Sequence, residues 1–585
     1  MPPKHFFTFG PFLLDADEQR LLREGRAVPL PPKAFDTLLV LVGQSGHILM
    51  KDELMKQVWP ETYVEENNLQ QSISALRKVL EDGAGESRYI ETVPRRGYRF
   101  TARVEEYWDA KTESALEDLT SFAPPAVRSI AVLPFKPLVE ASRDEVLEMG
   151  MADTLITRLS NIRQINVRPM SAVRKYANIE QDAAAAGREQ LVDAVIEGSI
   201  QRSGDAVRVT VRLVRVTDVS VIWTGQFDQK FTDIFALQDA ISERVAGALT
   251  MELTGHESAR LTKRHTDNTE AYRLYLMGRY YLGKYTEEAG RKSIEYFNQA
   301  LEKDPGYALA YAGLADCYVV LGTDTHLPPK EVMPKAKAYA VKALEIDDTL
   351  AEAHASLGTY ELFYGWDWIA AERELKRALD LNPSFAGAHE LYSYFLAAMG
   401  RHREAIAEME RALELDPLSL VINADLGMAY YFARQHDQAI KQSRKAIEMD
   451  PNFVIAHLFI GWAYEQKKMY EEATAELNKA RTLSGSWARV VAELGHVYAA
   501  SGQRGEAHRL LHEMKGQAKR GHIDSANIAL IYTGLGERDQ ALQWLEKAYE
   551  ERSPWIPWLN VEPKFDHLRS DPRLLDLLRR MNLTP

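Results

Sequence analysis

The chain has 585 residues, of which 46% are hydrophobic and 26% are charged, a composition that excludes a disordered protein. Its length exceeds what one hydrophobic core supports and predicts about three to five domains. The formal net charge of −13 excludes a protein that coats nucleic acid along its whole length. One small domain with a different charge balance remains compatible with this total, so charge has to be read domain by domain.

The start of the chain lacks the apolar core of a secretory signal. No stretch approaches the ~18 consecutive apolar residues that a membrane-spanning helix needs. We therefore expect a cytoplasmic protein without membrane contact. The single cysteine, Cys317, excludes an intramolecular disulfide framework and a cysteine-based zinc site, and its helical surroundings predict a small buried apolar role.

Residues 1–104 have the pattern of a small α+β domain. Short apolar runs broken by Gly and charged turns predict an antiparallel sheet at the start. Three helices are expected next, an amphipathic one that begins at Pro32, a short one over Lys51–Val58 and a third from about Glu65 to Leu80. A hairpin with its tip at Pro94–Gly97 closes the domain. Together these elements predict a winged helix-turn-helix.

The third predicted helix has one apolar and one polar face. Leu69, Ile73, Leu76 and Leu80 lie on the apolar face. The polar face carries amide side chains that can pair with adenine edges and basic side chains that suit guanine or phosphate. Its residues are Asn67, Asn68, Gln70, Gln71, Ser74, Arg77 and Lys78. Arg95 and Arg96 at the hairpin tip are candidates for phosphate or minor-groove contacts. The alternative is a solvated helix face and an ordinary charged turn.

Trp59, the triplet Leu76-Arg77-Lys78 and the hairpin segment 90–100 resemble the effector domain of OmpR/PhoB-type response regulators. The resemblance covers residues 5–104. It implies that the third helix enters the major groove and that the hairpin, as a wing, contacts the flanking minor groove. On the matching positions it implies DNA contacts by Asn67, Asn68, Gln71, Ser74, Arg77, Lys78, Arg95 and Arg96. For Arg77, pairing with an acidic residue inside the domain stays open as an alternative.

Charge within this domain is uneven. Residues 1–104 hold fourteen Lys and Arg against fourteen Asp and Glu, whereas residues 67–103 hold seven against four. The positive charge is therefore concentrated near the candidate binding face. Because phosphate neutralisation dominates affinity, such a modest patch favours binding to double-stranded DNA as a homodimer or at adjacent sites.

Members of that family usually carry a receiver domain before the winged helix, and the position of this domain near residue 1 predicts that none is attached here. The arrangement resembles CadC- and ToxR-like regulators, which start with the winged helix and continue into a membrane helix. Residues 105–126 instead predict an acidic linker, which cannot span a bilayer.

Residues 127–255 predict an α/β domain. Strands are expected at 129–135, 194–200, 207–216 and 219–227, the last three in succession, and helices at 145–159 and 234–253. The motifs Ala131-Val-Leu-Pro-Phe and Glu197-Gly-Ser resemble a TolB-like domain. Arg208, Arg212 and Arg215 alternate along one predicted strand, where they either bind an anion or form a solvated sheet face.

The C-terminal half has a period of 34 residues. Small residues, aromatic or large apolar residues, and alanines each recur at this spacing, in the columns Ser393, Gly427, Gly461, Gly495, Ala529; Leu396, Tyr430, Tyr464, Tyr498, Tyr532; and Ala405, Ala439, Ala473, Ala507, Ala541. These columns match the tetratricopeptide repeat and predict about eight helix pairs over 268–553. Residues 554–585 are expected to cap the array. Repeats of this kind imply a groove for a peptide or partner protein, which is an argument from fold analogy.

The predicted fold class is thus multidomain and mainly α, with a winged helix, a middle α/β domain and an α-solenoid. Motifs for nucleotide binding, serine hydrolysis and zinc proteolysis are absent, so we expect no enzyme, no cofactor and no metal. The preferred hypothesis is a DNA-binding transcriptional regulator modulated through its repeats. Two alternatives stay open, a protein-interaction scaffold and an accessory subunit of a signalling enzyme, neither acting on DNA.

Overall fold

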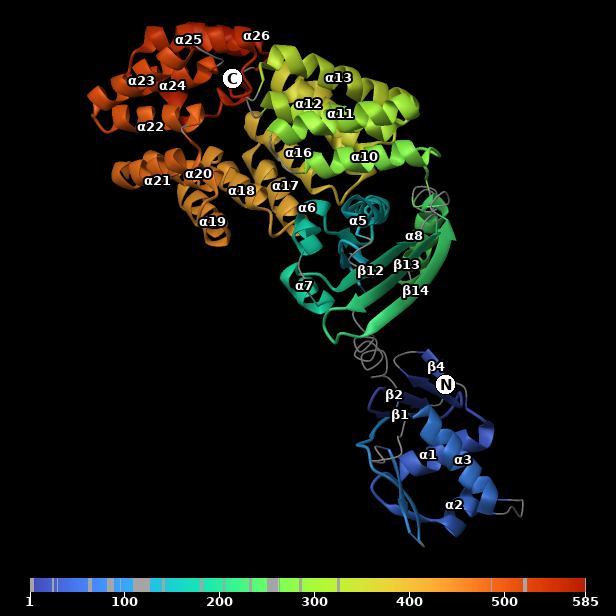
Figure 1. Cartoon of the computed structure of the whole chain (residues 1–585). Helices are drawn as coiled ribbons and strands as arrows, with labels where there is room; N and C mark the ends of the chain where they lie inside the picture. The colour runs from blue at the N-terminus through green and yellow to red at the C-terminus, as the bar shows by residue number, and fades with distance from the viewer. Residues whose placement is uncertain are drawn as a thin grey trace. The chain divides into compact units, whose positions relative to one another are not determined.

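The computed structural model divides into two compact units, Met1–Ala126 and Val127–Pro585 (Figure 1). The structure describes residues 5–23, 26–28, 30–60, 66–80, 89–94, 96–108, 127–138, 143–178, 182–203, 206–230, 234–249, 261, 263–283, 287–323, 327–485, 487–518 and 523–583.

The first unit opens with a five-stranded antiparallel sheet in the order β4-β3-β2-β1-β8. Its strands are β1 (His5–Phe9), β2 (Phe12–Asp15), β3 (Arg20–Arg23), β4 (Arg26–Val28) and β8 (Glu105–Trp108). Strand β8 pairs with β1, with His5 opposite Trp108. The prediction that the linker starts at residue 105 is therefore wrong for Glu105–Trp108, because these residues complete the sheet edge. The rest of the predicted linker, 109–126, lies outside the described residues.

Three helices and a second sheet follow, as predicted. The helices are α1 (Pro32–Gly43), α2 (Lys51–Val58) and α3 (Glu66–Val79), and the three-stranded sheet has the order β5-β7-β6, with β5 (Ile48–Met50), β6 (Ile90–Val93) and β7 (Gly97–Phe100). Proline at the first turn suits α1 because that position needs no amide donor. Leu38, Leu69, Ile90 and Phe100 are fully buried in one core. This confirms the winged helix-turn-helix.

The second unit begins with a six-stranded mixed sheet of order β11-β9-β12-β13-β14, to which β10 adds by pairing with β12. The strands are β9 (Ser129–Val132), β10 (Lys136–Pro137), β11 (Asn166–Val167), β12 (Ala194–Ser203), β13 (Ala206–Arg215) and β14 (Val221–Lys230). The accompanying helices are α5 (Glu145–Leu159), α6 (Met170–Val173), η2 (Arg174–Asn178), α7 (Ala183–Glu189) and α8 (Ile234–Ala248). This confirms the sheet-containing middle domain.

One face of β13 is buried, and the other carries Arg208 and Arg212. Arg208 lies 2.5 Å from Asp228, and Arg212 lies 3.0 Å from Glu197. These cross-strand ion pairs supply the arginines with carboxylates from neighbouring strands. The geometry favours the solvated sheet face over the anion site.

The remaining residues form a helical array, and its described part comprises eight antiparallel helix pairs. In chain order these are α10 (Thr269–Leu282), α11 (Glu287–Lys303), α12 (Ala308–Thr323), α13 (Pro329–Ile346), α14 (Ala351–Tyr360) extended by η4 (Glu361–Gly365), α15 (Trp368–Leu381), α16 (Ala386–Ala398), α17 (His402–Leu415), α18 (Leu420–Phe432), α19 (His436–Met449), α20 (Val454–Gln466), α21 (Tyr470–Leu483), α22 (Ala488–Ala500), α23 (Arg504–Ala518), α24 (Ser525–Leu535) and α25 (Arg538–Glu551). The repeat solenoid is confirmed.

The repeat columns have a packing explanation. A Cβ atom added to Gly461 on α20 would lie 2.8 Å from the side chain of Leu477 on α21, so only glycine lets the two helices approach this closely. Ala473, the alanine column of the same pair, is fully buried. The 34-residue period therefore results from the packing of neighbouring helices and identifies no ligand.

The middle domain and the array contact each other within the second unit. Helix α5 packs on α10, where Thr154 and Tyr272 share a hydrogen bond of 2.8 Å and Asp153 accepts one of 3.2 Å from Arg279. A second contact joins Arg168 to the carboxyl end of α17, whose carbonyls at Glu414 and Leu415 accept from its guanidinium at 2.7 and 3.0 Å. A cation suits this helix end because the carbonyls there lack partners and carry partial negative charge.

After the last helix pair, the chain forms η5 (Ile556–Trp558), η6 (Pro563–Leu568) and α26 (Pro572–Arg580). Helix α26 packs on α25, and Arg580 pairs there with Glu546. The short helices η5 and η6 contact α16 and α24, the first helices of their pairs, and η5 also contacts α25. The C-terminal residues therefore cover the end of the array and also contact first helices of the pairs.

Candidate nucleic-acid interface

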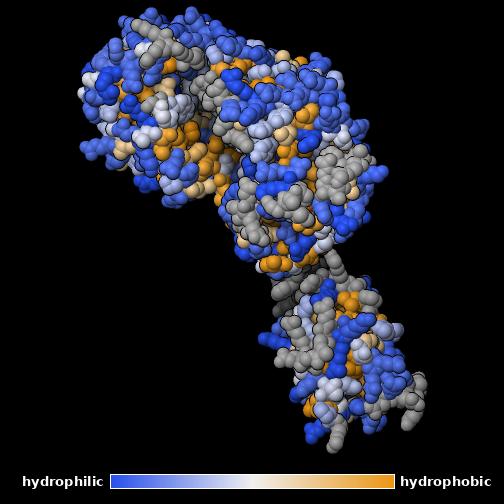
Figure 2. All heavy atoms as spheres, viewed as in Figure 1, coloured by the Kyte–Doolittle hydropathy of each residue, from blue (hydrophilic) through white to orange (hydrophobic). Residues whose placement is uncertain are grey.

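Helix α3 presents its polar face to solvent. Its apolar side chains Leu69, Ile73 and Leu76 are at most 2% exposed and pack on α1 and α2. The exposed side chains are Asn67, Asn68, Gln70, Gln71, Ser74 and Lys78. Since the amphipathic pattern determines which face is buried, the predicted readout residues are brought together on one exposed surface. Figure 2 shows this unit with a largely polar surface in the same view.

Arg77 is the exception on this face. Its Nη2 atom donates to the carbonyl of Ile90 at 2.8 Å and to the hydroxyl of Thr92 at 2.7 Å, both on β6 of the wing. The sequence left open an acidic partner inside the domain, and the structure provides a carbonyl and a hydroxyl instead. Arg77 therefore ties α3 to the wing and acts as a positioning residue. Thr92 gave no sequence signal because its role depends on how the hairpin packs against α3.

At the wing tip, the side chain of Arg96 is exposed, while Arg95 lies outside the described residues. Arg99, further along the same strand, pairs with Glu91 across the hairpin at 2.5 Å. Cross-strand pairs of this kind stabilise the hairpin and reduce the charge available to a ligand. Arg96 is thus the described arginine whose side chain is exposed at the wing tip.

The base of the wing depends on Gly97. A Cβ atom at this position would lie 1.9 Å from the carbonyl oxygen of Leu49 on β5, a backbone atom that cannot rotate away. Glycine is therefore required where β7 pairs with β5, next to the arginines of the tip. This close approach explains why the hairpin segment 90–100, which carries the resemblance, has a glycine at position 97.

We predict that Gly97→Ala destabilises the winged helix by about 3 kcal/mol, the upper range for overpacking in a closed site. Hydrogen exchange by mass spectrometry on the full chain should show faster exchange of peptides from residues 48–50 and 89–100. Gly43→Ala is the matched control, because a Cβ atom there has no neighbour within 4 Å and alanine favours the helix. Equal exchange in the two variants would contradict the prediction.

Among the described residues there is no group of three or more His, Cys, Asp or Glu side chains arranged to hold a metal ion. Nor does any helix in the described part of the chain have the length and apolar content to cross a membrane. The candidate interface consists of neutral amides, hydroxyls and cations. Its chemistry suits hydrogen bonding to base edges and pairing with phosphate.

Three family comparisons match successive parts of the chain. Residues 25–100 match the family described as "Transcriptional regulatory protein, C terminal". Residues 126–244 match "HilA/YgeH-like transcriptional regulator, second domain". Residues 360–419, 424–486 and 526–553 match "Tetratricopeptide repeat". The residues expected to form a TolB-like domain thus match the second domain of HilA/YgeH-like regulators instead.

Individual relatives agree with this order. The Transcriptional regulator HilA of Salmonella typhimurium is 26% identical over 408 residues, which cover 68% of this chain and 68% of that protein. The Transcriptional activator CadC of Escherichia coli is 35% identical over 119 residues, or 20% and 22% of the two chains. The Putative adenylate cyclase 3 of Rhizobium meliloti is 27% identical over 258 residues, or 43% of each chain.

The N-terminal match covers α1 to β7, the elements that carry the candidate interface. The winged helix near the start of this sequence fits the CadC- and ToxR-like arrangement. The matched N-terminal and middle families are families of transcriptional regulators. The chain is thus similar, part by part, to the transcriptional regulatory protein C-terminal family, the HilA/YgeH-like second-domain family and the tetratricopeptide repeats.

Proposed function

We propose that this chain is a sequence-specific DNA-binding transcriptional regulator whose repeat array binds a partner protein that modulates it. The observation that carries the proposal is the exposed polar face of α3 beside the wing, in a domain of the transcriptional regulatory protein family. The matched families support a regulator, and we propose no catalytic role and no cofactor. The site of action is the cytoplasm, where the chain meets DNA.

In this proposal α3 enters the major groove. Asn67, Asn68, Gln70 and Gln71 contact base edges, and amides of this kind pair bidentately with adenine. Ser74 and Lys78 contact base edges or phosphates further along the helix. Arg77 holds α3 against the wing, while Arg95 and Arg96 contact the backbone or minor groove. The modest positive charge of 67–103 supports binding as a homodimer on double-stranded DNA.

Selection of binding sequences from random double-stranded DNA with the purified full chain tests the proposal. We expect enrichment of one short motif, repeated at a spacing of one helical turn for a dimer. Enrichment no greater than that of a chain lacking residues 1–108 would contradict DNA recognition. It would then favour the scaffold alternative, in which the winged helix binds a protein.

The wing assignment predicts a salt effect. Replacing both arginines, Arg95→Ala with Arg96→Ala, should reduce the slope of log affinity against log salt by about 2, because each lost phosphate contact removes about 1. Mobility-shift titrations over a salt series on the selected motif measure this slope. Arg20→Ala is the control, since Arg20 lies on β3 and pairs with Asp15. An unchanged slope in the double variant would remove the wing from the interface.

A further inference from the structure

The segment Ser553–Leu583, called the C-terminal segment below, lies against the inner face of the repeat array. The ring of Trp558 packs against Phe363, Tyr394 and Phe432, with centroids 5.5, 6.2 and 6.1 Å away. These three residues come from η4, α16 and α18, the first halves of three consecutive helix pairs. The end of the chain thus occupies the groove in which repeat arrays of this kind hold peptides.

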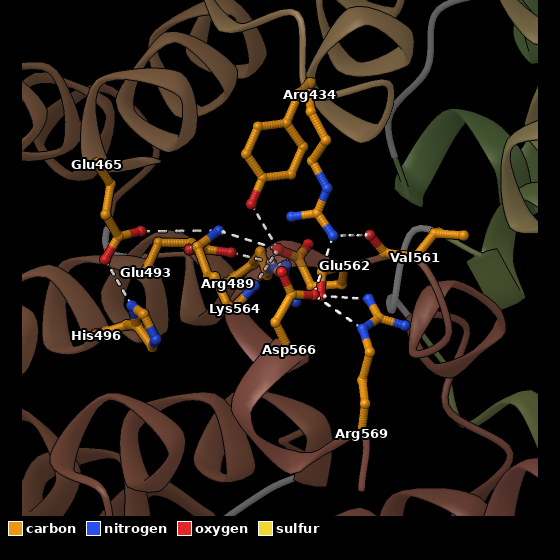
Figure 3. Close-up of polar contacts among 11 residues, drawn as sticks. Arg434, Glu465, Arg489, Glu493, His496, Val561, Glu562, Lys564, Asp566 and Arg569 are labelled. Atoms are coloured by element: carbon orange, nitrogen blue, oxygen red, sulfur yellow. Dashed lines mark hydrogen bonds and ion pairs between the residues drawn. The ribbon is translucent and has the colours of Figure 1, made fainter. Parts of the chain in front are cut away.

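A buried lysine anchors the middle of this segment (Figure 3). Lys564 is 4% exposed as a residue, and its Nζ atom lies 2.9 Å from Glu493 of α22 and 3.9 Å from Glu465 of α20. Burial alone would lower the pKa of Lys564, but Glu493, Glu562 and Glu465 outweigh it and raise that pKa. The lysine is therefore held as a cation between carboxylates of two successive helix pairs.

Further polar contacts surround this lysine. Tyr431 of α18 donates a hydrogen bond of 2.5 Å to Glu562 of the C-terminal segment, and burial raises the pKa of its hydroxyl well above the ordinary value. Arg434 donates to Asp566 at 2.9 Å (Figure 3). Removing one partner of a buried ion pair is strongly unfavourable, because the remaining charge loses a partner. The groove therefore favours a cation at the position of Lys564, beside Glu493, which also pairs with Arg489 at 2.7 Å.

The contact between segment and groove also has unsatisfied donors. The indole N–H groups of Trp366, Trp462, Trp555 and Trp558 have no hydrogen-bond partner among the described residues. A buried donor without a partner is unfavourable. A small pocket, with room for about one water molecule, lies in the same contact and is lined by three of these tryptophans and by Arg489. Figure 2 shows hydrophobic side chains gathered at the surface between α20 and α22.

The C-terminal segment thus contributes aromatic side chains and one cation to its contact with the array. Two aromatic anchors, Trp555 and Trp558, stand three residues apart, and Lys564 follows six residues after the second. A peptide with the same aromatic side chains and a cation can make the same contacts with the array. Charge complementarity indicates its chemistry, because the carboxylates of Glu465, Glu493 and Glu562 surround the lysine. Glu493 also pairs with Arg489 at 2.7 Å, and Glu465 with His496 at 2.5 Å.

We propose that the groove is a binding site for a segment of a partner protein that carries two bulky aromatic side chains followed by a lysine. The chain's own C-terminal segment fills this site and leaves when the partner binds. The inference deepens the partner half of the proposed function and is independent of DNA recognition by the first unit. It identifies the chemistry of the partner from the groove itself.

The test uses a fluorescent peptide with the sequence of residues 553–585 and the full chain. Lys564→Glu places a fourth carboxylate beside Glu465, Glu493 and Glu562, so it should release the C-terminal segment in cis. The added peptide should then bind at least tenfold more tightly than to the unaltered chain, because a site that is mostly occupied shows reduced apparent affinity. A peptide with the same Lys→Glu change should not bind to either chain.

Lys479→Glu is the matched control, since it makes the same charge change at an exposed residue of α21. Circular dichroism and a DNA mobility shift on each sample check that both units are folded. A second chain with Trp555→Ala and Trp558→Ala empties the groove without adding charge. It keeps the test decisive if Lys564→Glu prevents folding of the array.

Folded variants that bind neither peptide would show that the C-terminal segment is a permanent part of the array and would overturn the proposal. Equal binding of the peptide to unaltered and variant chains would overturn the claim that the segment occupies the site. Concentration-dependent dimers that need an intact segment would identify a second copy of the chain as the occupant. This result would overturn the proposal that a different protein binds in the groove. Loss of DNA binding alone would affect the proposed function and leave this inference standing.

Discussion

Replacing two amides of α3, Asn68→Ala with Gln71→Ala, is expected to lower affinity for the selected DNA motif at least 30-fold. Each bidentate contact between an amide side chain and adenine provides about 1–3 kcal/mol of discrimination. Both side chains are exposed on the polar face of α3, so their removal leaves the core of Leu69, Ile73 and Leu76 intact. The folded domain should therefore lose recognition and keep its stability.

The salt dependence distinguishes this variant from a wing variant. Amides carry no charge, so the slope of log affinity against log salt should stay the same, and non-specific binding should change little. Mobility-shift titrations on the selected motif and on scrambled DNA measure both quantities. Gln44→Ala provides the control, because Gln44 is an exposed amide at the end of α1. Equal losses on motif and scrambled DNA would place these amides outside base recognition.

Arg168→Ala is expected to separate the middle domain from the repeat array. The guanidinium of this residue, which is 4% exposed, donates to four main-chain carbonyls, those of Gln190 and Leu191 in the middle domain and those of Glu414 and Leu415 in α17. Each buried acceptor left without a partner costs about 1–3 kcal/mol. The local free energy of opening should fall by at least about 4 kcal/mol.

Hydrogen exchange by mass spectrometry on the full chain should show faster exchange on both sides of this contact, in peptides around residues 166–192 and 411–420. Arg168→Lys should give an intermediate result, since lysine keeps the charge but cannot present the planar fork of guanidinium donors. Arg188→Ala, at an exposed position of α7, is the matched control. Faster exchange on only one side would show that Arg168 stabilises its own domain and does not join it to the array.

Both predictions concern how a partner bound to the repeat array affects DNA binding in the proposed function. The second unit holds its middle domain on α10 and on α17, so a change in the groove of the array has a physical route to that domain through α5 and Arg168. The C-terminal segment contacts the same array from α16 to α24. We therefore expect that displacement of that segment by a partner affects the middle domain of the second unit.

Several parts of the molecule were predictable because they repeat or alternate locally. The spacing of Leu69, Ile73 and Leu76 determined which face of α3 is buried, since helical periodicity acts over a few residues. The 34-residue columns predicted the helix pairs for the same reason, because each pair packs through its own small residue and alanine. The exposed amides of α3 followed from the buried face without further information.

Other features depend on contacts between residues distant in the chain. Arg77 matched a DNA-contact position by resemblance, but its partners lie on β6, where hairpin packing puts a carbonyl and a hydroxyl within reach. Residues 105–108 looked like linker because their charges gave no strand pattern, and only the free edge of β1 made them a strand. Neither arrangement has a periodic signal in the sequence.

The groove shows the same division most clearly. By itself the sequence determined that an array of helix pairs exists, because each pair is specified by packing between neighbours along the chain. Only the tertiary structure decided what fills the groove, since Tyr431 meets Glu562 across 131 residues. It also decided how the middle domain joins the array, since Arg168 meets Glu414 across 246 residues. Such contacts are set by the curvature of the whole array, which accumulates over many repeats and leaves no local pattern.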